Sequence, residues 1–286
     1  MSREKPTGVP FIKIENLTVD GYCLRGQLDR ARRVFYSMID KTIEPDIISY
    51  SVLINGYCKK KKLAEAMQLF HEISQKVLKT VTVTYNTILQ GLFEVKRIGD
   101  AKNIFAEMLS TGPVPNLCTH CSLLNGYFKY GLVEEAMLLY NRLEGKRENI
   151  DIEFYNVVIN GLCKNGILDK AHVIFEKLSL IGVLPDVITY TIMINGFCLG
   201  GFLDEAKDML RNMEDNGCLP DNVTYSVFVQ GFLRCSKISE MTTFMKEMAG
   251  RSFSFDATTS ELLVKVIIEN PSVLDMIPEL YSDYKK

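Results

Sequence analysis

Polar side chains recur at a fixed spacing along this chain and could hydrogen-bond a ligand. Asparagine stands at Asn16, Asn86 and Asn156, which are separated by multiples of 35 residues. The same register holds hydroxyl or thiol side chains at Ser51, Cys121, Thr191 and Ser226. A second polar column follows four residues later, at Asp20, Asn55, Gln90, Asn125, Asn160, Asn195 and Gln230. An amide both donates and accepts hydrogen bonds, and an apolar core does not need amides at a constant pitch. The columns therefore favour a ligand that itself repeats.

The same spacing also governs residues with structural roles. A glycine column reads Gly21, Gly56, Gly91, Gly126, Gly161, Gly196 and Gly231. An alanine column (broken only at Met241) reads Ala31, Ala66, Ala101, Ala136, Ala171 and Ala206. A bulky apolar column reads Phe35, Phe70, Phe105, Tyr140, Phe175, Leu210 and Met245. The register has no insertion and defines seven repeats, 12–46, 47–81, 82–116, 117–151, 152–186, 187–221 and 222–256. Self-similarity at one period indicates a stacked repeat array.

Each repeat is predicted to be a helical hairpin. In the repeat 47–81, the first half has the amphipathic helical spacing of Tyr50, Leu53, Ile54 and Tyr57. The second half has a similar pattern, and several repeats end in Pro-Asp or a relative, which stops one helix and caps the next. We therefore expect an all-α fold, a right-handed α-solenoid (superhelix) of stacked hairpins. A stub, 1–11, precedes the repeats, and a partial repeat or cap, 257–286, follows them.

Composition constrains the partners and the compartment. A net charge of −2 and a pI of about 6.0 weigh against binding of polyanions. Four of the eight cysteines share one repeat column, Cys23, Cys58, Cys163 and Cys198, which indicates small buried hydrophobes in a reducing compartment. No apolar run approaches the ~18 residues that a membrane span needs. The N-terminus has no secretory signal and no convincing organelle transit peptide.

The pattern I-T-Y-x-x-x-I-N-G-x-C, followed by L-D-E-A and a terminal P-D, resembles the pentatricopeptide repeat. The resemblance covers 245 of 286 residues, and the uniform repeat length is similar to the P class of that family. Repeats such as NGYCKKKKLAEAMQLF also resemble the fertility-restorer-like subgroup of plants. The resemblance implies a single-stranded RNA that lies along the concave face, with one base for each repeat.

The resemblance also implies a role for individual residues, where positions are counted from the first residue of each repeat. Positions 5 and 35 together read a base edge. Asn16 with Asp46 and Asn156 with Asp186 are similar to uracil readers. Asn86 with Asn116 is similar to a pyrimidine reader that prefers cytosine. Thr191 with Asp221 is similar to a guanine reader, and Ser226 with Asp256 to a weaker purine reader. Ser51 with Val81 and Cys121 with Asp151 depart from the pattern, so the implied target is U, any, C or U, any, U, G and a purine.

Two further positions complete the implied site. Aliphatic side chains at position 2 sandwich each base, at Ile48, Val83, Ile188 and Val223, but Lys13, Cys118 and Glu153 depart from this pattern. Basic side chains at position 13 would contact phosphates weakly, at Lys59, Lys129, Lys164 and Arg234. Stacked in a solenoid, positions 2, 5 and 9 would form parallel rails along one surface.

Structural interpretations compete with these roles. An aspartate at position 35 also caps a helix, and the position 9 column also fits a solvated face or hydrogen bonding between repeats. Cys118 and Cys121 flank His120, but no second pair lies at ligand spacing, so we expect no metal site. No catalytic motif is present, and we expect neither an enzyme nor a cofactor.

The leading hypothesis is therefore a non-catalytic, sequence-selective RNA-binding protein. By family resemblance it would act in a mitochondrion or plastid, in RNA stabilisation, processing or translation, with other RNA-processing proteins as further partners and no membrane or small-molecule substrate. The first alternative is a protein- or peptide-binding scaffold of the tetratricopeptide kind, whose repeats usually have about 34 residues. The second alternative is a truncated remnant with little RNA affinity.

Overall fold

The computed structural model describes residues 9–75, 81–145, 150–247, 255–269, 271 and 273. These residues form fifteen α-helices and no β-strand, so the predicted all-α class is confirmed for the described part. The first helices of the seven repeats are α1 Val9–Leu24, α3 Ile47–Lys59, α5 Thr82–Glu94, α7 Leu117–Lys129, α9 Ile152–Lys164, α11 Val187–Gly200 and α13 Asn222–Arg234. The second helices are α2 Leu28–Asp40, α4 Leu63–Gln75, α6 Ile98–Thr111, α8 Val133–Gly145, α10 Leu168–Leu180, α12 Leu203–Asp215 and α14 Ile238–Glu247, and α15 Ala257–Glu269 follows them.

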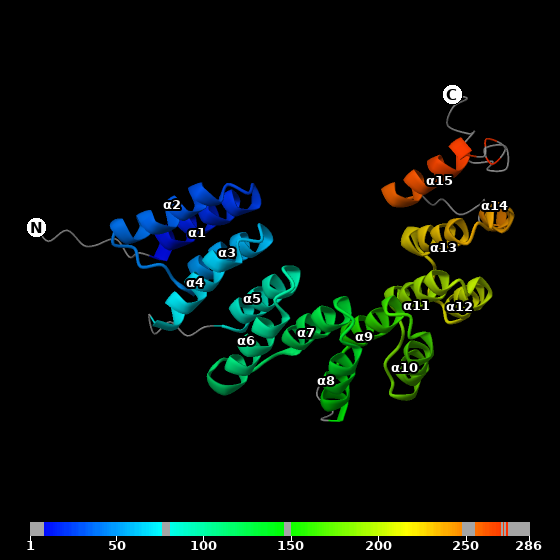
Figure 1. Cartoon of the computed structure of the whole chain (residues 1–286), viewed down its shortest axis with the longest axis horizontal. Helices are drawn as coiled ribbons and strands as arrows, with labels where there is room; N and C mark the ends of the chain where they lie inside the picture. The colour runs from blue at the N-terminus through cyan, green and yellow to red at the C-terminus, as the bar shows by residue number, and fades with distance from the viewer. Residues whose placement is uncertain are drawn as a thin grey trace, which may run out of the picture. The chain divides into compact units, whose positions relative to one another are not determined.

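The helices stack as hairpins within each of two compact halves, Met1–Gly126 and Tyr127–Lys286 (Figure 1). In the N-terminal half, α1, α3 and α5 pack side by side, and each packs against the second helix of its own repeat. In the C-terminal half, α9, α11, α13 and α15 form a corresponding row, backed by α10, α12 and α14. Each half therefore has the architecture of an α-solenoid, because every hairpin buries its apolar faces against its neighbours.

The ends of the repeat array differ slightly from the prediction. Helix α1 begins at Val9, inside the predicted stub 1–11, because a proline such as Pro10 is tolerated in the first turn of a helix. Helix α15 packs on α13, as expected for the first helix of a partial eighth repeat. The rest of the stub, 1–8, and residues 270, 272 and 274–286 of the predicted cap lie outside the described residues.

The aspartate of the Pro-Asp pair at the end of a repeat caps the first helix of the next repeat. Asp46, Asp186 and Asp221 precede α3, α11 and α13, and each carboxylate accepts a hydrogen bond from the backbone N–H three residues later, at 2.8 Å. This is the N-cap that satisfies one of the unpaired donors of a helix start. Helix α5 has Val81 at the same place and no side-chain cap.

The turn between the two helices of a hairpin uses one backbone conformation at position 15. The residue there has a left-handed φ in every repeat, at Gly26, Lys61, Lys96, Gly131, Gly166, Gly201 and Ser236. Glycine adopts this conformation without steric cost. Lys59 to Lys62 therefore form an exposed turn between α3 and α4, as their composition predicted.

The glycine column allows consecutive first helices to approach closely. A Cβ atom on Gly56 would lie 2.5 Å from the Sγ of Cys23, and one on Gly196 would lie 2.5 Å from the Sγ of Cys163. Position 12 of one repeat therefore fits against position 10 of the next. A Cβ atom on Gly21, in the first repeat of this sequence, would have nothing within 4 Å. The predicted tight contact is confirmed at the six later glycines.

The aromatic column joins each repeat to the next one. Phe35 meets Tyr50, Phe70 meets Tyr85 and Phe175 meets Tyr190 edge to face, with ring centroids 5.0 to 5.3 Å apart. The six alanines of the alanine column are fully buried between paired helices. The core of each half is therefore a chain of equivalent contacts, which holds the first helices at a constant pitch.

Candidate nucleic-acid interface

Three asparagines at position 5 hydrogen-bond the residue at position 35 of the same repeat. The Nδ2 of Asn16 donates to Asp46 Oδ1 at 3.2 Å, and the Nδ2 of Asn156 donates to Asp186 Oδ1 at 3.4 Å. The Nδ2 of Asn86 lies 3.5 Å from Asn116 Oδ1. The acceptors also cap the following first helix. The capping role and the orientation of the amide therefore coexist in one side chain.

Two of these amides keep an oxygen without a partner. Among the described residues, neither Asn86 Oδ1 nor Asn156 Oδ1 has a hydrogen-bond donor, although both atoms are buried. The Oδ1 of Asn16 instead lies 2.6 Å from Ser49 Oγ. A buried acceptor without a donor is costly, so these two oxygens are available to a donor on a ligand.

Thr191 and Ser51 are held differently from the asparagines. The hydroxyl of Thr191 donates to Val187 O at 2.7 Å and lies 2.8 Å from the hydroxyl of Thr224. Thr224 in turn donates to Asp221 Oδ1 at 2.9 Å, so Thr191 and Asp221 are linked through a third side chain. Ser51 makes the equivalent contacts with Ile47 O and Thr84. In this repeat Val81 stands at position 35 and gives the following helix, α5, no side-chain cap.

The remaining predicted reader pair, Ser226 with Asp256, and the pair that departs from the pattern, Cys121 with Asp151, differ from these in the placement of their members. Ser226 is 2% exposed, while Asp256 caps α15 by accepting from Thr259 N at 2.7 Å. The hydrogen bonds from Thr259 lower the pKa of Asp256. Cys121 is half-buried in the N-terminal half, and Asp151 in the C-terminal half caps α9 through Phe154 N at 3.0 Å.

The position 5 column does not form the open surface rail that the repeat pattern predicted. Asn16, Asn86 and Asn156 are only 7 to 8% exposed. The glycine contact brings consecutive first helices so close that the next helix covers most of each side chain. A ligand edge must therefore enter between two first helices to reach these amides.

Position 2, in contrast, stands out from the surface as predicted. Ile48, Val83, Ile188 and Val223 are 57 to 64% exposed, on the first turn of α3, α5, α11 and α13. Exposed aliphatic side chains at a regular interval leave apolar area in contact with water, which a flat apolar ligand group would cover. The departures from the pattern, Lys13, Cys118 and Glu153, are exposed as well.

Repeat one has a cavity between the position 5 side chain and the exposed position 2 side chain of the next repeat. The cavity at this place measures about 460 Å³, which is room enough for a planar group. It is lined by the predicted reader pair Asn16 and Asp46 and by the predicted sandwiching residue Ile48, with Lys13, Leu17 and Asp20. The cavity thus brings together the predicted reader pair of repeat one and the predicted sandwiching residue of repeat two.

The position 9 column contributes hydrogen bonds between repeats. The amide of Gln90 donates to Ser122 Oγ at 3.2 Å, and that of Gln230 donates to Thr259 Oγ1 at 2.8 Å. At these two positions the structural interpretation is confirmed. The basic residues of position 13, Lys59, Lys129, Lys164 and Arg234, are all exposed near the ends of their first helices.

A column of hydroxyl residues at position 3 was not identified from the sequence as part of the site. It reads Ser49, Thr84, Thr119, Thr189, Thr224 and Thr259, and every member except Ser49 is threonine. All six side chains are fully buried. Each one hydrogen-bonds the helix-capping residue at position 35, the side chain at position 5 of the preceding repeat, or the amide at position 9 of the preceding repeat. The recurring Asp-x-x-Ser/Thr pattern was the available signal, since it completes a capping box. Phe154 interrupts the column in repeat five.

The cysteines and histidines do not assemble a metal site in the described part of the chain. No group of three or more His, Cys, Asp or Glu side chains there is placed to hold an ion. His120 stands at position 4, where the neighbouring repeats have Tyr85 and Tyr155, and it meets Phe105 with ring centroids 6.2 Å apart. Burial raises the pKa of Cys58 to about 11 and that of Cys163 to about 12. Of the described helices, none combines the length and the apolar character of a membrane span.

Family comparisons agree with this repeat architecture. Sequence models of the PPR repeat and the PPR repeat family match residues 16–74, 81–147, 150–218 and 223–253. The chain belongs to the PPR repeat family. No curated protein sequence matches it.

Solved structures show the same fold. The chain is similar to the pentatricopeptide repeat protein PPR10 from maize, with 21% identity over 87% of this chain and 40% of that one, and a TM-score of 0.60. It is also similar to PPR10 in complex with an 18-nt psaJ RNA element, with 20% identity over 95% of this chain and 45% of that one, and a TM-score of 0.62. The chain therefore spans less than half the length of these proteins. A tetratricopeptide repeat protein from Parabacteroides merdae is 14% identical over 88% of this chain and 97% of that one, with a TM-score of 0.53.

Proposed function

We propose that this chain binds single-stranded RNA and selects its sequence with one side-chain pair for each repeat. The observation that carries the proposal is the hydrogen bond between positions 5 and 35 in the Asn16, Asn86 and Asn156 repeats. That bond fixes the direction of an amide that would otherwise rotate. A fixed donor and acceptor can distinguish one base edge from another.

The chemistry of uracil fits the two unpartnered oxygens. The N3–H of uracil would donate to Oδ1 of Asn156, while the second N–H of the same amide would donate to a uracil carbonyl. Cytosine has no N3–H, but its amino group offers a donor to Asn86 Oδ1. The exposed aliphatic residues at position 2, such as Ile188, would cover the faces of the inserted base.

The base preferences follow repeat by repeat. Asn16 with Asp46 and Asn156 with Asp186 select uracil, Asn86 with Asn116 selects a pyrimidine, and Thr191 with Asp221 selects guanine. Ser226 with Asp256 prefers a purine, and the repeats with Val81 and Cys121 are not selective. Ile48, Val83, Ile188 and Val223 contact base faces, and Lys59, Lys129, Lys164 and Arg234 contact phosphates.

The ligand class is extended from a similar protein. PPR10, whose fold this chain shares, has been crystallised with an 18-nt RNA element. We also extend the usual setting of the family, so the bound RNA is an organelle transcript in a mitochondrion or plastid. Binding protects or remodels that transcript without any chemical step by this chain, alongside other RNA-processing proteins.

A peptide-binding scaffold is the second candidate, because the net charge of −2 does not favour RNA. The likeness to a tetratricopeptide repeat protein shows that the fold alone does not separate the two functions. The amide and acid pairs do separate them, since a peptide ligand gives no reason for a pair in register with each repeat.

Binding to synthetic RNA tests the proposal. Fluorescence anisotropy would compare a single-stranded RNA that contains U-N-C-N-U-G with its complement and with the duplex of the two. We expect the first strand to bind at least tenfold more tightly than the other two. Equal or absent binding to all three would contradict the proposal.

A further inference from the structure

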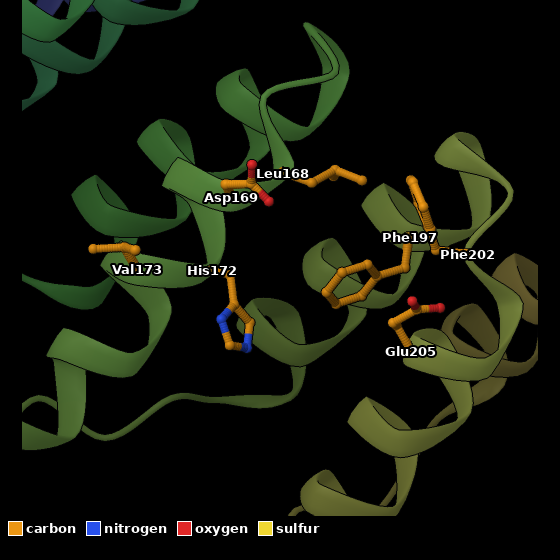
Figure 2. Close-up of a pocket in the computed structure, with 7 residues that line it drawn as sticks. All are labelled: Leu168, Asp169, His172, Val173, Phe197, Phe202 and Glu205. Carbon is orange, nitrogen blue, oxygen red and sulfur yellow. The ribbon is translucent and has the colours of Figure 1, made fainter.

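A second cavity lies in the C-terminal half, away from the predicted base-reading residues. It measures about 490 Å³ and is lined by Leu168, Asp169, His172, Val173, Phe197, Phe202 and Glu205. Figure 2 shows Asp169 and His172 of α10 on one side and Phe197, Phe202 and Glu205 on the other. The cavity therefore combines two phenyl rings with two carboxylates, and none of these residues belongs to positions 2, 5 or 9 of a repeat.

The equivalent place one repeat later is occupied by the ammonium group of Lys207. Its Nζ lies 5.6 Å from the ring centroid of Phe232 and 3.5 Å from carboxylate oxygens of both Asp204 and Glu240. Lys207, Asp204, Phe232 and Glu240 stand 35 residues after His172, Asp169, Phe197 and Glu205. The fold itself thus shows which group this arrangement of one ring and two acids holds.

Repeat one has an arginine at the position of this lysine, and its guanidinium carbon lies 5.5 Å from the ring centroid of Tyr36. Arg32 occupies the position of Lys207, next to Tyr57, Asp29 and Glu65 at the equivalent positions. Burial raises the pKa of Tyr57; the positive charge of Arg32 lowers it, while Glu65 and Asp29 raise it further. A cation therefore lies near this ring in a second repeat.

Only the cation is missing from the cavity of Figure 2. His172 is shorter than lysine and carries no permanent charge, and its Nε2 lies 3.6 Å from Glu176, outside the set of lining residues. Asp169 and Glu205 have no ion-pair partner among the described residues. Phe202, which is 49% exposed, adds a second ring where the other six repeats have Gln27, Lys62, Arg97, Leu132, Ile167 and Lys237.

We propose that this cavity receives a lysine side chain of a partner protein, whose ammonium group takes the place that Lys207 fills one repeat later. The alkyl stem would lie against Phe197, Phe202 and Leu168, and the ammonium group would lie between Asp169 and Glu205. An ammonium over an aromatic face and beside two carboxylates is stabilised by both contacts. The proposal is independent of RNA binding.

The test uses the full chain and short peptides. Acetyl-Gly-Lys-Gly-amide would be titrated into 15N-labelled protein at pH 7.5, with backbone amide shifts as the readout. We expect saturable shifts confined to α10, α11 and α12. The same peptide with norleucine or Nε-acetyl-lysine has the stem without the charge, and we expect no saturable shift with either.

Variants locate the site. His172→Lys supplies the missing cation from within the chain, so we expect at least a tenfold loss of peptide affinity. Phe197→Leu, a residue that the same column already holds at Leu92 and Leu162, should weaken binding roughly fivefold. Glu205→Gln should weaken it roughly threefold. Asp215→Asn makes the same charge change at the other end of α12 and should leave affinity unchanged.

Three results would overturn the proposal. The first is equal binding of the lysine and norleucine peptides, which would identify a merely apolar cavity. The second is unchanged affinity in His172→Lys and Glu205→Gln, with far-UV circular dichroism showing both variants folded. The third is tighter binding of spermidine than of the peptide at the same amides, which would identify a free polyamine in place of a protein partner.

Discussion

Asn156 donates one amide hydrogen to Asp186, and its oxygen has no partner among the described residues. At the scale of single residues, this combination of a fixed donor and an available acceptor is the reason why we propose Asn156 as a base-reading side chain. Asp186 contributes to two functions, because the same carboxylate also accepts from Thr189 N. Helix capping and orientation of the amide can be separated by comparing variants of Asp186 and Asp151.

Asp186→Ala is expected to affect both folding and base selection. The lost N-cap should lower the free energy of unfolding by about 1 kcal/mol. The freed amide of Asn156 should lose its preference for uracil at the fifth base by roughly 3- to 10-fold. Chemical denaturation and RNA competition would measure the two effects.

Asp151→Ala is the matched control. Asp151 caps α9 by accepting from Phe154 N at 3.0 Å, and the amide of Asn156 hydrogen-bonds Asp186 instead of Asp151. We expect a similar loss of stability and an unchanged preference at the fifth base. Loss of that preference in both variants would mean that stability, and not amide orientation, controls it.

At the scale of helices, the glycine column sets the distance between repeats. A Cβ on Gly161 would lie 2.1 Å from the ring of Phe128, whereas one on Gly21 would have nothing within 4 Å. Gly161→Ala should therefore destabilise the protein by about 1–3 kcal/mol. Gly21→Ala should stabilise it by up to about 1 kcal/mol through helix propensity alone. Urea denaturation would compare the two, and equal effects would contradict the close approach.

The thiols of Cys58 and Cys163, which face Gly91 and Gly196, should be unreactive in the folded protein. Burial raises the pKa of Cys58 to about 11 and that of Cys163 to about 12, so little thiolate is present at pH 8. Iodoacetamide should modify the exposed Cys118 first, as peptide mass spectrometry would show. Rapid alkylation of Cys58 in the folded protein would contradict this placement.

The same shifts predict the direction of a pH effect on stability. A thiol whose pKa is raised by folding stays protonated in the native state while the unfolded state loses its proton. The stabilising contribution is complete below the unfolded pKa of about 8.5 and decreases as the pH rises above it. Alkaline pH should therefore lower the denaturation midpoint under reducing conditions.

The helices and their packing could be predicted from the sequence, but the depth of the reading residues could not. Gly56, Ala66 and Phe70 each recur every 35 residues, so the period identified the hairpins and their contacts. The burial of Asn86 depends on how closely α7 lies to α5. The 35-residue period does not determine this distance. The column of hydroxyl residues at position 3, which includes Thr224, was not predicted, because the sequence does not show whether a hydroxyl side chain is buried or exposed.

At the scale of the whole molecule, a net charge of −2 limits the electrostatic part of RNA binding. Four exposed basic residues stand at position 13, which we propose to contact phosphates, namely Lys59, Lys129, Lys164 and Arg234. Each neutralised phosphate contributes about −0.7 to the slope of log K against log salt for a single strand, so we expect a slope of about −3 or shallower. Affinities between 50 and 300 mM salt would measure it, and a much steeper slope would indicate binding elsewhere on the surface.

The central claim is that the position 5 side chain selects one base in each repeat that has a reader pair, and Thr191→Asn tests it most directly. Asparagine at this position would reach Asp221 as Asn16, Asn86 and Asn156 reach their partners. The measurement is the ratio of affinities for two RNAs that differ only in G or U at the sixth base. We predict that the wild-type protein prefers G and the variant prefers U, and an unchanged ratio would contradict the account.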